Sequence, residues 1–204
     1  MNIFISDFVR IGNAEVIKNG EKIFHLSSEP QLQAAEFYRL LKMSYPKFFK
    51  MDLLAQWGIV TAELLLQNSS PLPADPFRMA LLFQNITASS HADQAYQKTL
   101  QEIPSPALFV YTLPNIVMGE IAIRHSIKGE NTFVVSKQFS PEHLVEYART
   151  LFDQEIADEM ILAFLEIGSE EADIFMLRIS TLSSYHTFSK DTLLQLYETP
   201  LKNY

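Results

Sequence analysis

Three consecutive segments in the second half of the sequence decide the fold class. They are 132–136 (TFVVS), 141–154 (PEHLVEYARTLFDQ) and 159–167 (EMILAFLEI). The first and third are short apolar runs, which are typical of buried strands. The middle segment opens with a proline, which is favoured in the first turn of a helix. Strand, helix and strand in this order indicate a parallel crossover connection and therefore an α/β layered domain.

The alternation of strands and helices continues on both sides of this unit. We expect a first strand at the start of the chain and a hairpin over 14–26 that turns at Asn19 and Gly20. The other predicted elements are strands over 78–83 and 172–179 and helices over 31–41, 53–67, 91–102, 113–127 and 190–198. The sequence therefore predicts one domain over 1–204, an α/β fold with a mainly parallel mixed sheet and helices on its faces.

The helix predicted over 141–154 is amphipathic. Its polar side carries Glu142, His143, Glu146, Arg149, Thr150 and Asp153, and its apolar side carries Leu144, Val145, Ala148, Leu151 and Phe152. A helix that is buried on all sides would not tolerate so many charges, because unpaired buried charge is costly. We therefore expect this helix to face solvent or a polar partner on one side.

Composition and charge exclude several classes of function. The 204 residues are 48% apolar, have a formal net charge of −8 and include no cysteine. The absence of thiols excludes disulfides, thiolate metal sites and a cysteine nucleophile. The acidic balance disfavours nucleic-acid binding, which needs clustered positive charge. The six glycines are too far apart in the sequence to form a phosphate-binding loop.

The sequence also lacks the signals of a membrane span and of export. No run of about 18 apolar residues occurs, and the start has no basic region of a signal peptide. We therefore expect a cytoplasmic protein. The five histidines (His25, His91, His125, His143 and His186) lack the spacing of metal ligands, so neither a metal nor a cofactor is expected.

Four segments, in this order, resemble motifs of the N-terminal half of β-ketoacyl-acyl-carrier-protein synthases, the condensing enzymes of the thiolase fold. They are Lys50-Met51-Asp52, Pro114-Asn115 with Gly119-Glu120-Ile121-Ala122, the segment 129–136, and the segment 157–166. The stretch 45–50 further resembles a divergent branch associated with aryl-polyene or flexirubin-type pigment clusters. The resemblance implies a thiolase-like half fold over roughly 1–166.

The chain departs from this family where the chemistry would take place. Counted from Gly129, the position of the family's nucleophilic cysteine is Gln138, and a carboxamide cannot form the acyl thioester. Paired glycines of the family are replaced by Ala163-Phe164 and by Gln84-Asn85. Only 204 − 166 = 38 residues follow Glu166, too few for the family's second half with its two catalytic histidines. We therefore expect a protein that cannot condense acyl chains.

Two interpretations of Gln138 stay open. In the first, its carboxamide polarises a carbonyl together with Asn115, as in a reduced decarboxylase or acyltransferase. In the second, the position is an abandoned site at which any polar residue would serve. The missing histidines weaken the first interpretation, because they would stabilise the developing enolate.

Two surfaces are candidates for binding a partner. Arg39, Lys42, Lys47 and Lys50 form a basic set within twelve positions that contain no acid. The family's acyl carrier proteins are acidic, so the basic set could dock a carrier protein, or it could be a solvated surface.

The second surface is the strand over 132–136. In the family, the strand before the nucleophile pairs with its copy across a two-fold axis. The resemblance would place Phe133 and Val135 at a dimer seam, with an identical chain or with a full-length condensing enzyme. Alternatively, this strand lies inside the sheet of a monomer.

Together these features predict a condensation-incompetent β-ketoacyl synthase-like protein. It would serve as a partner or scaffold in acyl-carrier-protein-dependent fatty acid or polyketide biosynthesis of the aryl-polyene type. The alternatives are the reduced decarboxylase or acyltransferase that uses Gln138, and a binding module for an unrelated ligand.

Overall fold

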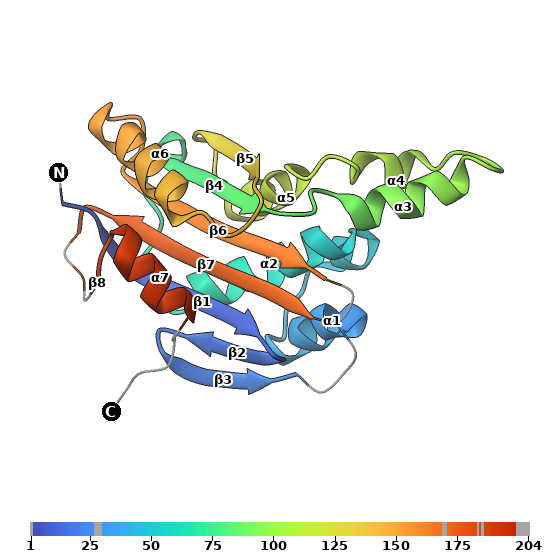
Figure 1. Cartoon of the computed structure of the whole chain (residues 1–204), viewed down its shortest axis with the longest axis horizontal. Helices are drawn as coiled ribbons and strands as arrows, with labels where there is room; N and C mark the ends of the chain where they lie inside the picture. Colours follow the sequence, from blue (N-terminus) through green and yellow to red (C-terminus); the bar gives the residue numbers. More distant parts are fainter. Residues whose placement is uncertain (1, 27–29, 169–170, 183, 185, 199–204) are drawn as a thin grey trace.

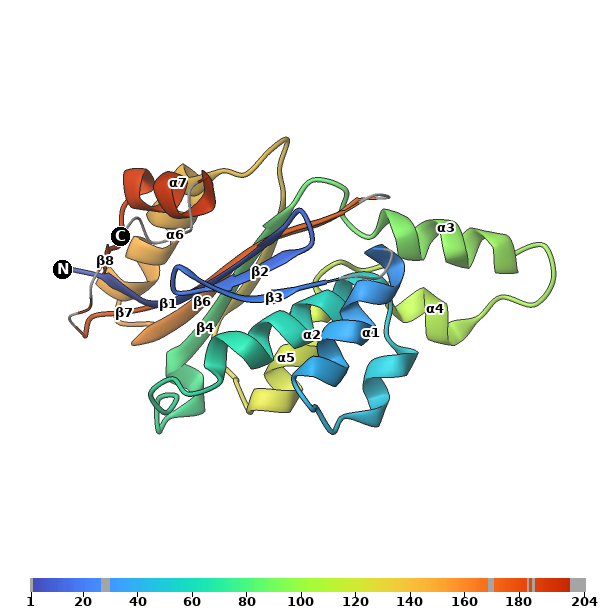
Figure 2. The ribbon, with the colours of Figure 1, turned by 90° about the horizontal axis from the view of Figure 1, so that it is seen from below.

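The computed structural model describes residues 2–26, 30–168, 171–182, 184 and 186–198. One eight-stranded sheet has helices on both of its faces (Figure 1, Figure 2). The strands are β1 (Phe4–Gly12), β2 (Glu15–Lys18), β3 (Glu21–His25), β4 (Met79–Asn85), β5 (Asn131–Val135), β6 (Glu159–Ile167), β7 (Ala172–Ser180) and β8 (His186–Thr187). The α-helices are α1 (Pro30–Leu40), α2 (Leu53–Leu66), α3 (Ser90–Thr99), α4 (Pro106–Val110), α5 (Ile116–His125), α6 (Pro141–Asp153) and α7 (Lys190–Glu198), with 3-10 turns η1 (Pro46–Lys50) and η2 (Pro76–Arg78).

The strands follow the order β3-β2-β1-β7-β6-β4-β5, and β8 pairs with β1 beside this path. The mixed α/β sheet is confirmed. Its parallel part is smaller than predicted, because only β4 pairs in parallel, with β5 and β6, while the other five pairings among the described residues are antiparallel. The connection from β6 to β7 is too short for a crossover, so these two long strands form an antiparallel pair.

The predicted hairpin is present as β2 and β3. Lys18 pairs with Glu21, and the two residues between them, Asn19 and Gly20, have positive φ angles of 51° and 81°. Two consecutive positive φ angles match the turn type that follows the right-handed twist of paired strands.

The strands separate two hydrophobic cores. On β4, Leu81 and Phe83 belong to the core beneath α1, α2 and α5, whereas Ala80 and Leu82 belong to the core beneath α6 and α7. This alternation follows from the period of two residues along a strand. Figure 2 shows the two helical layers on opposite sides of the sheet. No helix of the described part of the chain is long and apolar enough to span a bilayer.

Helices α2 and α5 approach each other closely at Gly58. A Cβ atom at this position would lie 2.1 Å from Cγ2 of Val117, so only glycine fits there without a shift of the helices. Asp52 begins α2, as predicted, by accepting hydrogen bonds from the backbone amides of Leu54 (3.3 Å) and Ala55 (3.1 Å).

The amphipathic character of α6 is confirmed, since Leu144, Ala148, Leu151 and Phe152 are buried and the charged residues face outward. Helix α7 packs beside α6 over the same core. The ring of Tyr197 on α7 lies over three phenylalanines, with centroid distances of 4.5 Å to Phe139, 5.9 Å to Phe164 and 6.0 Å to Phe175. The chain therefore covers this face of its sheet with its own helices.

The helix predicted over 113–127 is shorter in the structure. Its first turn is replaced by hydrogen-bonded turns, and α5 begins only after Asn115. The sequence did not predict the separate helix α4, which begins at Pro106 after the Ser105 cap. Helices α3 and α4 form a hairpin that projects from the body of the molecule in both views (Figure 1, Figure 2).

Candidate functional site

The carboxyl ends of the three parallel strands lie side by side at one end of the sheet. β4 ends at Asn85 between β5, which ends at Val135, and β6, which ends at Ile167. The two strands that follow β4 in the chain thus lie on opposite sides of it. Such a topological switch point is where open α/β sheets bind their ligands. We therefore take the carboxyl ends of β4, β5 and β6 as the candidate site.

Gln84 fastens the connection between β5 and α6 to the end of β4. Its side chain is completely buried. Its Oε1 accepts hydrogen bonds from the amide of Ser140 (3.0 Å) and the hydroxyl of Ser136 (3.3 Å), and its Nε2 donates to the carbonyl of Ser140 (3.2 Å). The amide of Ser136 donates to the carbonyl of Asn85 (2.8 Å). Both ends of the connection are therefore held.

Gln138 lies in this connection, between the end of β5 and Pro141. Its side chain is exposed, and its backbone carbonyl accepts a hydrogen bond from the Ser136 hydroxyl (2.7 Å). Gln138 is not among the residues that line the cavities described below. Gln138 thus follows the strand, with its side chain at the surface, and its role in a site stays a prediction.

Glu166, near the end of β6, fastens the segment that follows β4. Its Oε2 accepts hydrogen bonds from the amides of Ile86 (2.7 Å) and Thr87 (3.1 Å), and its Oε1 accepts one from the Thr87 hydroxyl (2.6 Å). A buried or half-buried carboxylate that receives several such bonds is a strong anchor. These hydrogen bonds hold the segment after β4 against the end of β6 at the switch point.

A small polar cavity of about 10 Å³ remains beside this network, lined by Asp52, Asn85, Thr87 and His91 among others. This volume accommodates about one water molecule. His91 donates from Nε2 to the carbonyl of Ile167 (3.0 Å). Burial raises the pKa of Asp52 to about 6, against the opposing effects of its backbone hydrogen bonds and of His91. The cavity is too small for an acyl thioester.

Asn115, the second candidate for polarising a carbonyl, is the N-cap residue of α5. Its side chain is exposed and makes no capping hydrogen bond. Asn115 lines none of the cavities described in this section, and neither does Gln138. A shared role of the two carboxamides stays a prediction. Among the described residues, no group of three or more His, Asp or Glu side chains gathers as metal ligands.

The basic set predicted from the sequence lies around the end of α1 and the turn η1, and all four side chains are exposed. Lys47 forms an ion pair with the buried Glu120 (2.6 Å), which also accepts a hydrogen bond from the Tyr111 hydroxyl (3.3 Å). Arg39, Lys42 and Lys50 form no ion pair within the described ranges. Three of the four cations are therefore available to a partner.

Strand β5, the predicted dimer seam, lies at the edge of the sheet rather than inside it. Phe133 is half-buried against the core beneath α2 and α5. Val135 has 53% of its surface exposed. An edge strand with exposed apolar residues offers unpaired backbone groups to another chain. Whether it pairs with one stays a prediction.

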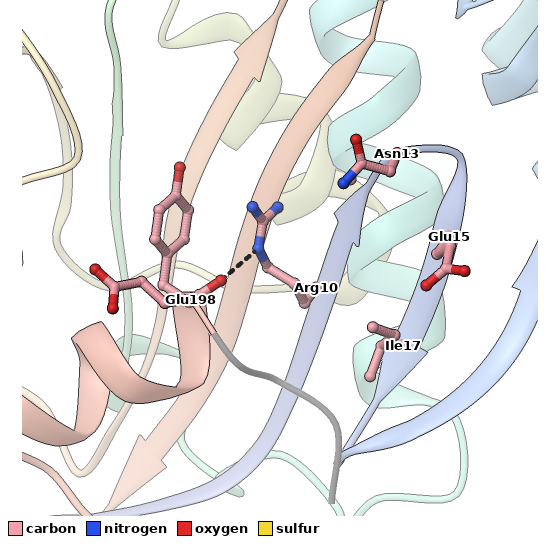
Figure 3. A pocket seen from close by; sticks show the side chains of 7 residues that line it. Arg10, Asn13, Glu15, Ile17 and Glu198 are labelled. Atoms are coloured by element: carbon pink, nitrogen blue, oxygen red, sulfur yellow. Dashed lines mark hydrogen bonds between the residues drawn. The ribbon is translucent and has the colours of Figure 1, made fainter.

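A larger cavity, of about 170 Å³, lies where α7 ends over β1 and β2 (Figure 3). Arg10 donates from Nε to the backbone carbonyl of Tyr197 (2.9 Å), its guanidinium lies 4.4 Å from the centre of the Tyr197 ring, and its Nη1 lies 2.7 Å from Asp173. Glu15 and Glu198 also line this cavity. Because Arg10 is neutralised by Asp173 and flanked by acids, we assign it to holding α7 in place.

Solved structures provide a direct comparison of this fold. The ketosynthase/chain length factor of ishigamide superposes with a TM-score of 0.65 at 14% identity, over 91% of this chain and 64% of that chain. The ketosynthase ApeO in complex with its chain length factor ApeC from Xenorhabdus doucetiae superposes with a TM-score of 0.59 at 11% identity, over 88% of this chain and 79% of that chain. This chain has the ketosynthase fold.

A third ketosynthase structure, the AntDE:AntF complex of a type II polyketide synthase with its acyl-carrier protein, gives a TM-score of 0.62 at 11% identity. This chain spans 63% of that chain's length and 64% of the ishigamide protein's, less than two thirds of each. No family model and no curated protein matches the sequence. The resemblance inferred from the sequence motifs is confirmed at the level of the fold.

Sequence reasoning identified Gln138 but not the groups that close the site around it. Gln84, Asn85 and Glu166 were noted only as departures from a motif or as its end. For His91 the sequence predicts only a hydrogen-bonded or solvent-exposed side chain without a metal, and the structure shows its bond to the carbonyl of Ile167. Their positions in the sequence could have identified these residues. Each lies at the end of a predicted strand or shortly after it, where the carboxyl ends of parallel strands form a site.

Proposed function

We propose that this chain is a ketosynthase-like subunit that does not condense acyl chains. It pairs with a condensing enzyme in the assembly of carrier-protein-bound chains of the polyketide or aryl-polyene type. The observation that carries the proposal is the closed switch point. Gln138 stands at the corner after β5, and the side chains of Gln84 and Glu166 hold the segments on either side of it.

The chemical nature of the residues at the switch point supports the lack of condensing activity. A carboxamide has no anionic form near neutral pH that could attack a thioester. The neighbouring cavity of about 10 Å³ admits one water molecule. The side chains of Gln84 and Glu166 make hydrogen bonds with backbone groups of the segments around the switch point, so separating these segments would leave those groups unpaired.

Two exposed surfaces support a role in an assembly. The edge strand β5 carries the half-buried Phe133 and the exposed Val135, and it offers a full row of backbone groups for pairing with a condensing enzyme. Arg39, Lys42 and Lys50 form a positive surface on a chain whose net charge is −8. An acidic carrier protein would be attracted to this surface and repelled by most of the rest.

Incubation of the purified chain with malonyl-loaded carrier protein, with and without a candidate condensing enzyme, tests the proposal. We expect no elongated product and no acyl adduct on the chain alone, by intact-mass spectrometry. We expect a stable complex with the condensing enzyme that Val135→Lys abolishes. Elongated product formed by the chain alone would overturn the proposal, and so would the absence of any such complex.

The variant Gln138→Cys tests whether the chain lacks only the nucleophile or also the surroundings that a reactive cysteine needs. We expect this variant to react with an acyl-pantetheine probe no faster than Lys137→Cys, a second exposed position, because the side chain at 138 is exposed and lines none of the cavities described above. Carbon dioxide release that depends on Gln138 would instead establish the decarboxylase alternative, and Gln138→Ala is the variant that measures it.

A further inference from the structure

The ends of helices α1, α2 and α5, which share one face of the sheet in Figure 2, enclose a hollow of about 230 Å³. It is lined by Leu41, Glu63, Leu66, Gln67 and His125, the last residue of α5. Leu41 and Leu66 pack against the core beneath these helices, so they form an apolar wall. A small apolar wall beside a few polar side chains is the usual composition of a ligand site.

Hydrogen bonds fix the helix ends that form this hollow. Lys18 on β2 donates from Nζ to the carbonyl of Leu64 (2.8 Å) at the end of α2. Helix α5 ends with Ser126 in the left-handed conformation (φ 58°), and the amide of Ile127 donates to the carbonyl of Ala122 (3.0 Å). The shape of the hollow therefore exists before a ligand binds.

The imidazole of His125 lacks a hydrogen-bond partner. Its Nε2 atom is buried and makes no hydrogen bond within the described part of the chain. Oε2 of Glu63 lies 3.8 Å away, too far for a direct hydrogen bond, and already accepts one from Nε of Arg124 (2.6 Å). Burial lowers the pKa of His125, so its ring is neutral at pH 7. A buried polar atom without a partner is costly.

The gap between His125 and Glu63 has the size of one oxygen atom. An oxygen that lies about 2.8 Å from both Nε2 and Oε2 would make two hydrogen bonds of ordinary length. The nearby carboxylate favours the tautomer with its proton on Nε2, so this oxygen must accept from the ring and donate to Glu63. A hydroxyl group does both. A carboxylate or phosphate would be repelled by Glu63, and an ammonium group cannot accept a hydrogen bond.

We propose that this hollow binds a small uncharged alcohol with an apolar body. Its hydroxyl group bridges His125 and Glu63, and its body lies against Leu41 and Leu66. Because a cavity of about 150 Å³ holds benzene, the hollow has room for one ring with a short substituent. His125 also lines a second hollow of about 230 Å³, beside Ile127, so its ring borders two free spaces and can turn to present Nε2. This inference does not rest on the proposed function.

NMR titration of the full chain with benzyl alcohol tests the proposal. We expect saturable shifts of the amides at 63–67 and 125 and of the His125 imidazole nitrogens, with a dissociation constant of about 1 mM. Toluene, which lacks the hydroxyl group, and benzoate, which is an anion, should bind at least about fivefold more weakly. Shifts that do not saturate or lie only in other parts of the chain would overturn the proposal, and so would equal binding of toluene.

Two histidine variants assign the binding to its site. His125→Phe keeps a ring of similar size but removes both nitrogens, so its affinity for benzyl alcohol should fall to that for toluene. His25→Phe is the control, because His25 is exposed on β3 and lines neither hollow, and it should bind like the wild type. Unchanged affinity in His125→Phe would overturn the proposal. The comparison of the three ligands on the wild type stays decisive if this variant does not fold.

Discussion

Gln84, completely buried at the end of β4, receives a 3.0 Å hydrogen bond from the backbone amide of Ser140 and donates one of 3.2 Å to the carbonyl of the same residue. This reciprocal pair fixes the corner that carries Gln138. It also explains why an amide side chain is found where the resembling family has glycine, since the amide fills the space and satisfies the backbone at once.

Replacing Gln84 should loosen this corner. In Gln84→Ala the amide and carbonyl of Ser140 lose their partner, and we expect the free energy of unfolding to fall by about 1 to 3 kcal/mol. Hydrogen exchange at 136–140 should become faster than elsewhere in the sheet. The control is Asn115→Ala, since that side chain is exposed and makes no capping bond. Unchanged exchange in Gln84→Ala would contradict the assigned role.

The pH dependence of stability should contain a contribution from Asp52. Its pKa is raised by burial from 3.8 to about 6, so the folded state holds the proton more tightly than the unfolded state. This contribution to the free energy of unfolding is therefore complete below about pH 4 and is lost as the pH rises through 6, by about 2 to 3 kcal/mol.

Asp52→Asn isolates this contribution, because asparagine caps a helix about as well as aspartate but does not titrate. The stability of the wild type relative to Asp52→Asn should fall between pH 4 and pH 7 in urea titrations. A difference that does not change with pH would show that Asp52 has an ordinary pKa in the folded state.

Two helical glycines should respond in opposite directions to alanine. At Gly58 a Cβ atom would meet Val117 at 2.1 Å, whereas at Gly119 nothing lies within 4 Å. We expect Gly58→Ala to lower the free energy of unfolding by about 1 to 3 kcal/mol. Gly119→Ala should raise it by about 0.5 to 1 kcal/mol through helix propensity. Thermal melts of the pair suffice, and equal shifts would refute the close approach of α2 and α5.

Carrier-protein binding should depend on Lys42 more than on a cation elsewhere. Lys42 is exposed and forms no ion pair among the described residues, and the same holds for Lys98 on α3. We expect Lys42→Glu to weaken binding of an acidic carrier protein about tenfold at low salt, with a smaller effect at 0.5 M salt because of screening. Calorimetric titration in which Lys98→Glu has the same effect would indicate only a general response to net charge.

Local patterns allowed the sequence to predict most of the elements. The hairpin at Asn19-Gly20, the Asp52 cap and the two faces of α6 follow from turn chemistry, capping and helical period, and all three are present. The balance of parallel and antiparallel pairing was harder to predict, because it depends on which strands that are distant in the sequence lie side by side. Strand β1, for example, pairs with β7 in an antiparallel direction.

The candidate site was predicted only in outline. The position of Gln138 followed from counting along a motif. The network around it brings together Gln84, Ser140 and Glu166, which lie more than 20 residues apart along the chain, and no local pattern encodes such contacts. Lys47 shows the same limit, since its pairing with Glu120 joins η1 to α5.

Helix α7 would compete with any partner for the face of the sheet that it covers. Tyr197 lies on Phe139, Phe164 and Phe175, and Arg10 and Asp173 hold it there. A second domain that approached this side would first have to displace the helix and then replace its aromatic contacts. Docking on that face and retention of α7 are therefore mutually exclusive, while the free edge of β5 can be engaged without any rearrangement of the core.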